Sequence, residues 1–148
     1  KRLFLLSSGT GFAPFAALIR EPETYERFNS IIVTHTCRMI TELSYSQSII
    51  QECKNDELLK GFIENKLISY YSTTRDNYIV NGRITELISN NKLFNDLKIN
   101  SISSDDRFMF CGSMGLNNDL KKIMIKNNLR EGANNNPAEF VLEKAFVD

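Results

Sequence analysis

The chain has 148 residues, of which 42% are hydrophobic, which is enough for one globular domain with a substantial core. Lysine plus arginine and aspartate plus glutamate each total 18, so the formal net charge is zero. This balance gives no indication of a nucleic-acid partner or a membrane surface, and no apolar run approaches the length of a bilayer span. We therefore expect a cytoplasmic protein that contacts neither nucleic acid nor membrane.

The cysteines and the single histidine exclude two kinds of site. The three cysteines (Cys37, Cys53 and Cys111) are odd in number and form no Cys-x-x-Cys pair, which favours reduced thiols over a disulfide framework or a zinc site. One histidine, His35, cannot form a histidine-rich metal cluster, and we expect no metal site. We interpret His35 as a strand histidine whose hydrogen bonds are satisfied.

Short apolar runs alternate with helix-like segments along the chain. The predicted strands are Leu3–Ser8, Ile31–His35, Leu67–Thr73, Phe108–Cys111 and Phe140–Lys144. The predicted helices are Phe12–Arg20, Thr41–Lys54, Arg83–Ser89 and Leu116–Asn128, with a loop at Asn95–Asp106 and a turn at Asn134–Pro137. This alternation is typical of a parallel sheet covered on both faces. The sequence predicts an α/β fold with a doubly wound five-stranded parallel sheet.

Glycine-rich, polar or basic residues follow the first four predicted strands. In an open α/β sheet, ligands bind outside the carboxyl ends of the strands, near the point where the strand order reverses. The residues in question are Ser8–Pro14, Thr36–Arg38, Thr74 and Arg75 with Arg83 farther on, and Cys111–Ser113. We therefore expect one ligand site at this edge of the sheet.

The turn after the first strand is a candidate phosphate loop. Gly9-Thr10-Gly11 lets the backbone turn tightly and approach a phosphate, while the helix behind it offers free N–H groups and a positive dipole end. Pro14 suits the first turn of that helix, where no N–H is needed. The run departs from Gly-x-Gly-x-x-Gly, with proline in place of the third glycine. The strand before it and the helix after it nevertheless favour phosphate binding.

The second predicted strand ends without the acid that usually holds the ribose 2′-hydroxyl of NAD. Arg38 lies there instead, and Arg75 and Arg83 follow the third strand. Each charge-assisted hydrogen bond contributes roughly 1.5–3 kcal/mol, so two or three of them on a 2′-phosphate favour NADP over NAD by about 10² or more. The alternative is that these arginines are solvated surface charges. That interpretation suits any one of them better than it suits all three.

Cys111 allows two interpretations. As a nucleophile it would need a nearby base, and the single histidine lies in a different and earlier strand. A small buried thiol at the end of a strand is the simpler interpretation.

Several motifs together resemble the bacterial ferredoxin (flavodoxin)–NADP reductases. They are Ser8–Phe15 (Ser-Gly-Thr-Gly-Phe-Ala-Pro-Phe), the Arg38 loop, Thr74-Arg75, Gly82-Arg83, Cys111-Gly112-Ser113 and the ending Glu143–Asp148. The similarity runs from Leu3 to the last residue and covers that family's nucleotide domain. The glycine-rich and Cys-Gly motifs occur across the wider superfamily, whereas the arginines and the Ala-Phe-Val ending point to the bacterial subclass.

The resemblance implies roles for the matching residues. In that family, residues like Gly9, Thr10 and Gly11 hold the pyrophosphate of NADP(H). The 2′-phosphate is held by residues like Arg38, Thr74, Arg75 and Arg83. Gly112 and Ser113 join the cofactor-binding set. One departure is Ser113-Met114-Gly115, where many superfamily members have a proline, so the local turn is expected to differ.

The resemblance also implies two catalytic residues, Cys111 and Glu143. The matching cysteine lies beside the reacting nicotinamide carbon and shapes the pocket without covalent modification. The matching carboxylate lies near the nicotinamide–flavin contact and supports hydride transfer. Ala145 matches a residue that covers the flavin ring, and Phe146 one that packs against the FAD adenine.

The expected function is that of the NADP(H)-binding domain, residues 1–148, of an oxidoreductase that exchanges electrons with ferredoxin or flavodoxin. The family's FAD-binding barrel is absent from the chain, which opens on Lys1 almost inside its first strand. We expect the barrel upstream, and a fragment without it to be inactive.

Three alternatives remain. An NADH-dependent reductase component of the same superfamily is disfavoured by the arginines and the missing acid. A non-catalytic nucleotide-binding module would have an unrelated partner domain upstream instead of a flavin barrel. A generic α/β domain without a ligand leaves unexplained why the motifs converge on one edge of the sheet.

Overall fold

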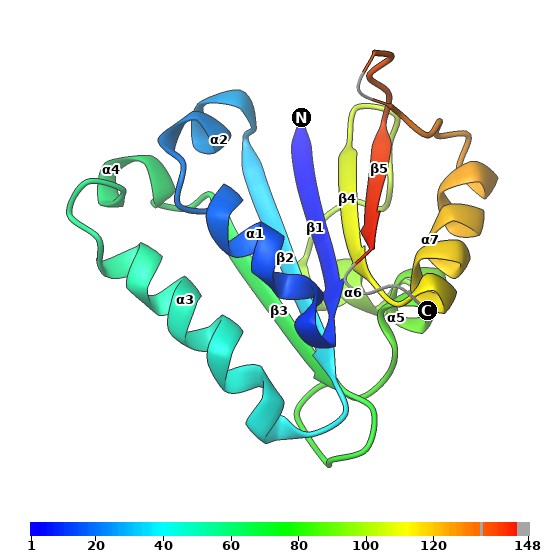
Figure 1. The fold of residues 1–148 in the computed structure, drawn as a ribbon, viewed down its shortest axis with the longest axis horizontal. Coiled ribbons are helices and arrows are strands. Elements are labelled where there is room, and N and C mark those ends of the chain that lie inside the picture. The colour runs from blue at the N-terminus through cyan, green and yellow to red at the C-terminus, as the bar shows by residue number, and fades with distance from the viewer. Residues whose placement is uncertain (134, 145–148) are drawn as a thin grey trace.

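A five-stranded parallel sheet forms the centre of the molecule, as the computed structural model of residues 1–133 and 135–144 shows (Figure 1). Its strands are β1 (Arg2–Ser8), β2 (Ser30–Cys37), β3 (Leu67–Thr73), β4 (Arg107–Gly112) and β5 (Phe140–Lys144). They lie in the order β3-β2-β1-β4-β5, so the order reverses between β1 and β4. The predicted fold class is confirmed.

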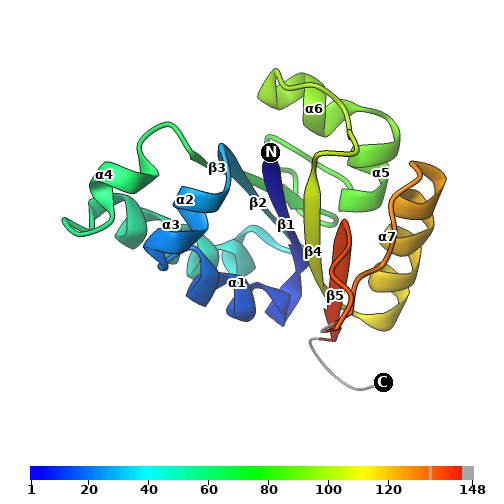
Figure 2. The same cartoon turned by 90° about the horizontal axis from the view of Figure 1, so that it is seen from above.

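Helices cover both faces of the sheet (Figure 2). One face carries α1 (Ala13–Leu18), α2 (Pro22–Arg27), α3 (Ser44–Asn55) and α4 (Lys60–Ile63). The other carries α5 (Ile84–Ser89), α6 (Lys92–Leu97) and α7 (Met114–Lys126). Short 3₁₀ turns, η1 (Gly9–Phe12) and η2 (Ile40–Leu43), precede α1 and α3. Such a sheet, wound in two directions from β1, is the doubly wound arrangement.

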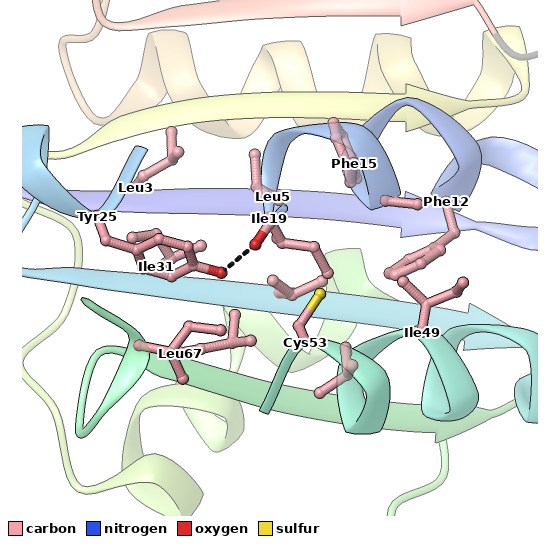
Figure 3. Close-up of a cluster of buried hydrophobic side chains, with 14 of the residues drawn as sticks. Leu3, Leu5, Phe12, Phe15, Ile19, Tyr25, Ile31, Ile49, Cys53 and Leu67 are labelled. Carbon is pink, nitrogen blue, oxygen red and sulfur yellow. Dashed lines mark hydrogen bonds between the residues drawn. The ribbon is translucent and has the colours of Figure 1, made fainter. Parts of the chain in front are cut away.

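The strands bury apolar side chains on both faces because neighbouring residues point to opposite sides of a sheet. Leu3 and Leu5 of β1 contribute to the cluster beneath α1 and α3, which Figure 3 shows in close-up. Phe4 and Leu6 contribute to the opposite cluster, beneath α5 and α7. Two covered faces explain why the strands read as continuous apolar runs.

All five predicted strands exist, but three helices were missed. These helices, α2, α4 and α6, have six, four and six residues, which is too few to show a helical period. The predicted loop Asn95–Asp106 is wrong at its start, because α6 continues to Leu97. The predicted helix Phe12–Arg20 is shorter, since its first residue belongs to η1. The predicted turn at Asn134–Pro137 includes residue 134, which lies outside the described residues.

Among the described residues, no helix combines the length and the apolar character needed to cross a membrane. All three cysteines are free and buried.

Candidate functional site

A cavity of about 520 Å³ opens at the carboxyl edge of the sheet. It spans the point between β1 and β4 where the strand order reverses, and its size lies within the roughly 300–1,000 Å³ of small-molecule sites. The lining comprises Ser8–Thr10, Thr36–Arg38, Glu42, Thr74, Arg83–Thr85, Ser113, Gly115, Leu116 and Asp119. Residues that follow four different strands therefore meet in one cavity.

A second cavity, of about 330 Å³, lies toward the opposite end of β1 and β4. Apolar side chains such as Leu3, Leu18 and Phe28 form much of its wall. None of the site residues predicted from the sequence lines it. The candidate site is therefore the cavity at the carboxyl edge.

The two glycines of the phosphate loop serve different purposes. Gly9 has φ +52° and faces open space, so the backbone there is both left-handed and accessible. A Cβ on Gly11 would lie 2.1 Å from the carbonyl oxygen of Cys111. Gly11 is therefore needed for close packing against β4. Pro14 lies in the first turn of α1, as its missing N–H requires.

His35 extends from β2 to the phosphate loop and is 2% exposed. Its Nε2 lies 2.7 Å from the carbonyl oxygen of Gly9, and its Nδ1 lies 2.6 Å from the hydroxyl of Ser46 on α3. Burial lowers its pKa, against the opposing effects of the Gly9 carbonyl and of Glu42. The interpretation of His35 as a strand histidine with satisfied hydrogen bonds is confirmed.

Backbone hydrogen bonds join the loops that follow β2 and β3. The N–H of Thr74 donates to the carbonyl of Cys37 at 3.0 Å, and the N–H of Arg75 donates to the carbonyl of Arg38 at 2.9 Å. The carboxylate of Asp76 accepts from the N–H of Ile40 at 2.7 Å. These contacts fix the backbone that carries Arg38 and Arg75 before any ligand is bound.

The loop after β3 folds back and returns Arg83 to the cavity. The N–H of Gly82, where φ is +133°, donates to the carbonyl of Thr73 at 3.0 Å. The side-chain amide of Asn81 donates to the Thr73 hydroxyl at 3.0 Å and to the Asp76 carbonyl at 2.6 Å. Arg83 then occupies the N-cap position of α5.

Three guanidinium groups at this edge have no acidic neighbour. Arg38, Arg75 and Arg83 are exposed, and within residues 1–133 and 135–144 none has a carboxylate oxygen within 4.0 Å. Arg38 and Arg83 line the cavity, whereas Arg75 does not. The edge therefore presents three guanidinium groups that form no direct ion pair among the described residues.

Two carboxylates, Glu42 and Asp119, also line the cavity and were not predicted. Glu42 accepts a hydrogen bond from the N–H of Met39 at 3.2 Å, so it holds the turn that follows Arg38. Both lie within helical segments, η2 and α7, where no strand-end pattern marks them. A glutamate three residues after the start of a turn was the available signal for Glu42.

Cys111 and Glu143 are neighbours across β4 and β5, where they are paired in register. Burial and the nearby Glu143 raise the pKa of the Cys111 thiol, which keeps it protonated. The hydrogen bonds of His35 reach Cys37, at 3.3 Å, and not Cys111. These observations favour the buried thiol over the nucleophile. Neither Cys111 nor Glu143 lines the cavity, and Cys111 is fully buried.

The remaining predicted residues differ in position. Ser113 lines the cavity, and its hydroxyl accepts from the N–H of Leu116 at 3.2 Å as the cap of α7. Gly112 is buried and does not line it; an added Cβ would lie 2.6 Å from the hydroxyl oxygen of Ser8. Ala145 and Phe146 lie outside the described residues.

Known proteins resemble this chain along its whole length. It is 46% identical over 148 residues to a flavodoxin/ferredoxin–NADP reductase of Rhodobacter capsulatus, covering 99% of this chain and 55% of that protein. It is 38% identical over 148 residues to ferredoxin–NADP reductase A of Sorangium cellulosum, covering 99% and 53%. Over the matched half of these relatives, this chain is similar in sequence to the ferredoxin–NADP reductases. It spans about half the length of the curated relatives that it matches.

A solved structure shows the same fold for the reductase segment. The ferredoxin–NADP⁺ reductase of Neisseria gonorrhoeae, solved with bound FAD and NADP, superimposes with a TM-score of 0.83 at 23% identity, over 99% of this chain and 56% of that one. No protein-family model matches the chain.

Proposed function

We propose that this chain is an NADP(H)-binding domain, which positions the nicotinamide for hydride exchange with FAD in a ferredoxin or flavodoxin reductase. One observation carries the proposal: two arginines without acidic partners, Arg38 and Arg83, line the same cavity as the phosphate loop. A ligand with two separate phosphate groups fits this arrangement.

The pyrophosphate and the 2′-phosphate of NADP(H) would contact different parts of the cavity. Gly9 and Thr10 offer backbone N–H groups at the start of η1, which suit the pyrophosphate. Arg38, Thr74 and Arg83 suit the 2′-phosphate, because guanidinium groups bind phosphate oxygens in pairs. Arg75, on the neighbouring loop, would add charge from outside the lining.

The nicotinamide end would lie toward β4 and β5. Bound NADPH supplies the hydride. Glu143 would keep a carboxylate near the reacting ring. The side-chain amide of Asn117 donates to the main-chain carbonyl of Glu143 at 3.0 Å and so holds the β5 backbone there. Cys111 would shape the pocket wall as a neutral thiol. Because Cys111 is fully buried here, contact with a nicotinamide ring requires its neighbours to move.

The relatives' greater length supports a second domain. About half of each curated relative is matched by this chain, and an upstream FAD-binding barrel would account for the rest. Ferredoxin or flavodoxin would then exchange electrons with the complete protein, and the present chain would bind nucleotide without catalysing electron transfer. Ala145 and Phe146 would face that flavin.

Calorimetric titration with 2′-phospho-AMP and with AMP tests the proposal. We expect the first to bind about 10² times more tightly, because only it carries the phosphate that the arginines would hold. Arg83→Ala should remove most of that difference, whereas Arg20→Ala, an exposed arginine that pairs with Glu52 at 3.6 Å, should not. Equal affinities would indicate an NADH-type reductase, and binding of neither ligand would contradict the proposal.

A further inference from the structure

His35 makes a side-chain hydrogen bond from the buried strand β2 to the backbone of the phosphate loop. Its Nε2 lies 2.7 Å from the Gly9 carbonyl oxygen, 26 residues away along the chain. Its ring also packs against Phe12, with ring centroids 5.4 Å apart, and Ser46 contacts the other nitrogen. The imidazole is therefore held on three sides and has little freedom to leave the Gly9 carbonyl.

The geometry of the peptide bond links the direction of the Gly9 carbonyl to that of the Thr10 N–H. In a trans peptide the carbonyl of one residue and the N–H of the next point in opposite directions, and no cis peptide occurs among the described residues. When His35 draws the Gly9 carbonyl inward, the Thr10 N–H points away from His35. Gly9 and Thr10 are exposed and line the cavity. The N–H thus faces the space proposed for the pyrophosphate.

Gly9 makes such a restraint useful. Its φ of +52° is a conformation that glycine adopts easily but does not prefer over its alternatives, and open space surrounds it. Gly9 opens the 3₁₀ turn η1, and the hydrogen bond from His35 to its carbonyl adds a side-chain restraint from β2 to the one that the turn provides.

The partners of His35 determine where its proton resides. Nε2 lies 2.7 Å from the Gly9 carbonyl and 3.3 Å from the Cys37 sulfur. The carbonyl can only accept and the sulfur can accept as well, so both contacts are satisfied when Nε2 carries a hydrogen. The Ser46 hydroxyl can either donate to Nδ1 or accept from it, and it also lies 3.1 Å from the Leu43 carbonyl. The neutral ring and the protonated ring therefore both donate from Nε2 to Gly9. The restraint on the loop does not depend on the charge of the histidine.

We infer that His35 is a positioning residue for nucleotide binding: by donating from Nε2 to the Gly9 carbonyl, it orients the Thr10 N–H toward the pyrophosphate. The inference rests on the proposed function, because it concerns the phosphate loop of the same site. It predicts that His35 affects ligands with a pyrophosphate and has no effect on ligands that carry only the 2′-phosphate.

Two ligands and three variants test this prediction. NADP⁺ contains the pyrophosphate, whereas adenosine 2′-monophosphate contains only the phosphate assigned to the arginines. Loss of one oriented hydrogen bond predicts about 5- to 15-fold weaker NADP⁺ binding for His35→Leu and His35→Asn. Binding of adenosine 2′-monophosphate should stay within about twofold. His35→Gln, whose amide nitrogen can reach the position of Nε2, should restore most of the NADP⁺ affinity.

Nuclear magnetic resonance tests the contact in the unaltered chain. His35 is the only histidine, so a histidine-labelled sample contains one imidazole. The ¹⁵N shifts should show hydrogen on Nε2 at neutral pH, and the Thr10 amide resonance should move more in His35→Leu than in His35→Gln. A neutral ring with its hydrogen on Nδ1 would overturn the inference, because Nε2 would then face the Gly9 carbonyl without a proton.

The outcomes separate the inference from the function. If the unaltered chain binds neither ligand, the proposed function fails and the inference fails with it. If it binds both and His35→Leu binds NADP⁺ normally, the inference alone is wrong. If His35→Leu weakens both ligands equally and His35→Gln does not restore binding, His35 stabilises the fold and has no specific action on the loop.

Discussion

Arginines at the two ends of the sheet have opposite surroundings. At the amino end, Arg2 donates from Nε and Nη2 to the two carboxylate oxygens of Asp106, at 2.8 and 2.7 Å. It also donates to the carbonyls of Asn100 and Ser101, at 2.8 and 3.0 Å. At the carboxyl end, Arg38, Arg75 and Arg83 have no such partners within the described residues.

The difference separates charge that stabilises the fold from charge that remains available to a ligand. The Asp106 side chain is 2% exposed, and it accepts hydrogen bonds from Arg2 and, at 2.8 Å, from the N–H of Ser103. The arginines at the other end are exposed, and water already solvates them. Substitution at the amino end should therefore lower stability, and substitution at the carboxyl end should lower affinity.

The largest expected effect is that of Arg2→Ala. Removing the partner of a buried carboxylate leaves its charge uncompensated, which costs about 3–5 kcal/mol in buried pairs, and we expect the lower end because Arg2 is 18% exposed. Denaturant unfolding measures the loss. Nucleotide affinity of the folded fraction should not change. An affinity loss comparable to that of Arg83→Ala would contradict the separation of the two ends.

Gly11→Ala should be the exception at the carboxyl end, because it should lower both the stability of the fold and the affinity for nucleotide. A Cβ 2.1 Å from the Cys111 carbonyl oxygen forces η1 away from β4, and such overpacking costs about 1–3 kcal/mol. We expect a lower melting temperature together with weaker NADP⁺ binding. Gly61→Ala in α4, where nothing lies within 4 Å of the added Cβ, is the matched control: it should leave NADP⁺ binding unchanged and should keep or slightly raise the melting temperature, since alanine favours the helix.

Arg83→Ala should reduce affinity by about 10- to 100-fold for NADPH, and much less for NADH, which lacks the 2′-phosphate. Stability should stay within about 0.5 kcal/mol, as for most surface substitutions. Arg75→Ala should have the same direction but a smaller effect, since Arg75 does not line the cavity. Equal weakening of both coenzymes would be evidence against the 2′-phosphate site.

The smallest effect concerns pH and His35. Its folded-state pKa lies below the unfolded value because burial disfavours the charged ring, so the unfolded chain binds a proton more readily. Stability should therefore be complete above about pH 6.5 and should fall as pH drops below it, by at most about 1.4 kcal/mol per pH unit. His35→Gln should remove this component below about pH 6.5. If the stability of His35→Gln varied with pH as that of the unaltered chain does, this component would not come from His35.

Sequence reasoning located the sheet because its strands are buried on both faces and therefore read as continuous apolar runs. It also predicted that residues following four of the strands lie at one edge, because the carboxyl ends of parallel strands meet at the same edge of a sheet. It assigned Gly11 to phosphate approach, whereas the structure gives it a packing contact with Cys111, more than ninety residues farther along the chain. The contact between His35 and Gly9 was equally inaccessible, because it depends on the register of β1 and β2 and on where η1 begins.

The backbone hydrogen bonds between the loops after β2 and β3 have a consequence for the evolution of coenzyme choice. Main-chain groups of Cys37, Arg38, Thr74 and Arg75 make these bonds, so they do not depend on the arginine side chains. If the three arginines hold the 2′-phosphate as proposed, substitutions there would change coenzyme preference at little expense to folding. Preference for NADPH or NADH could then change in evolution, or by protein engineering, without a change of the backbone.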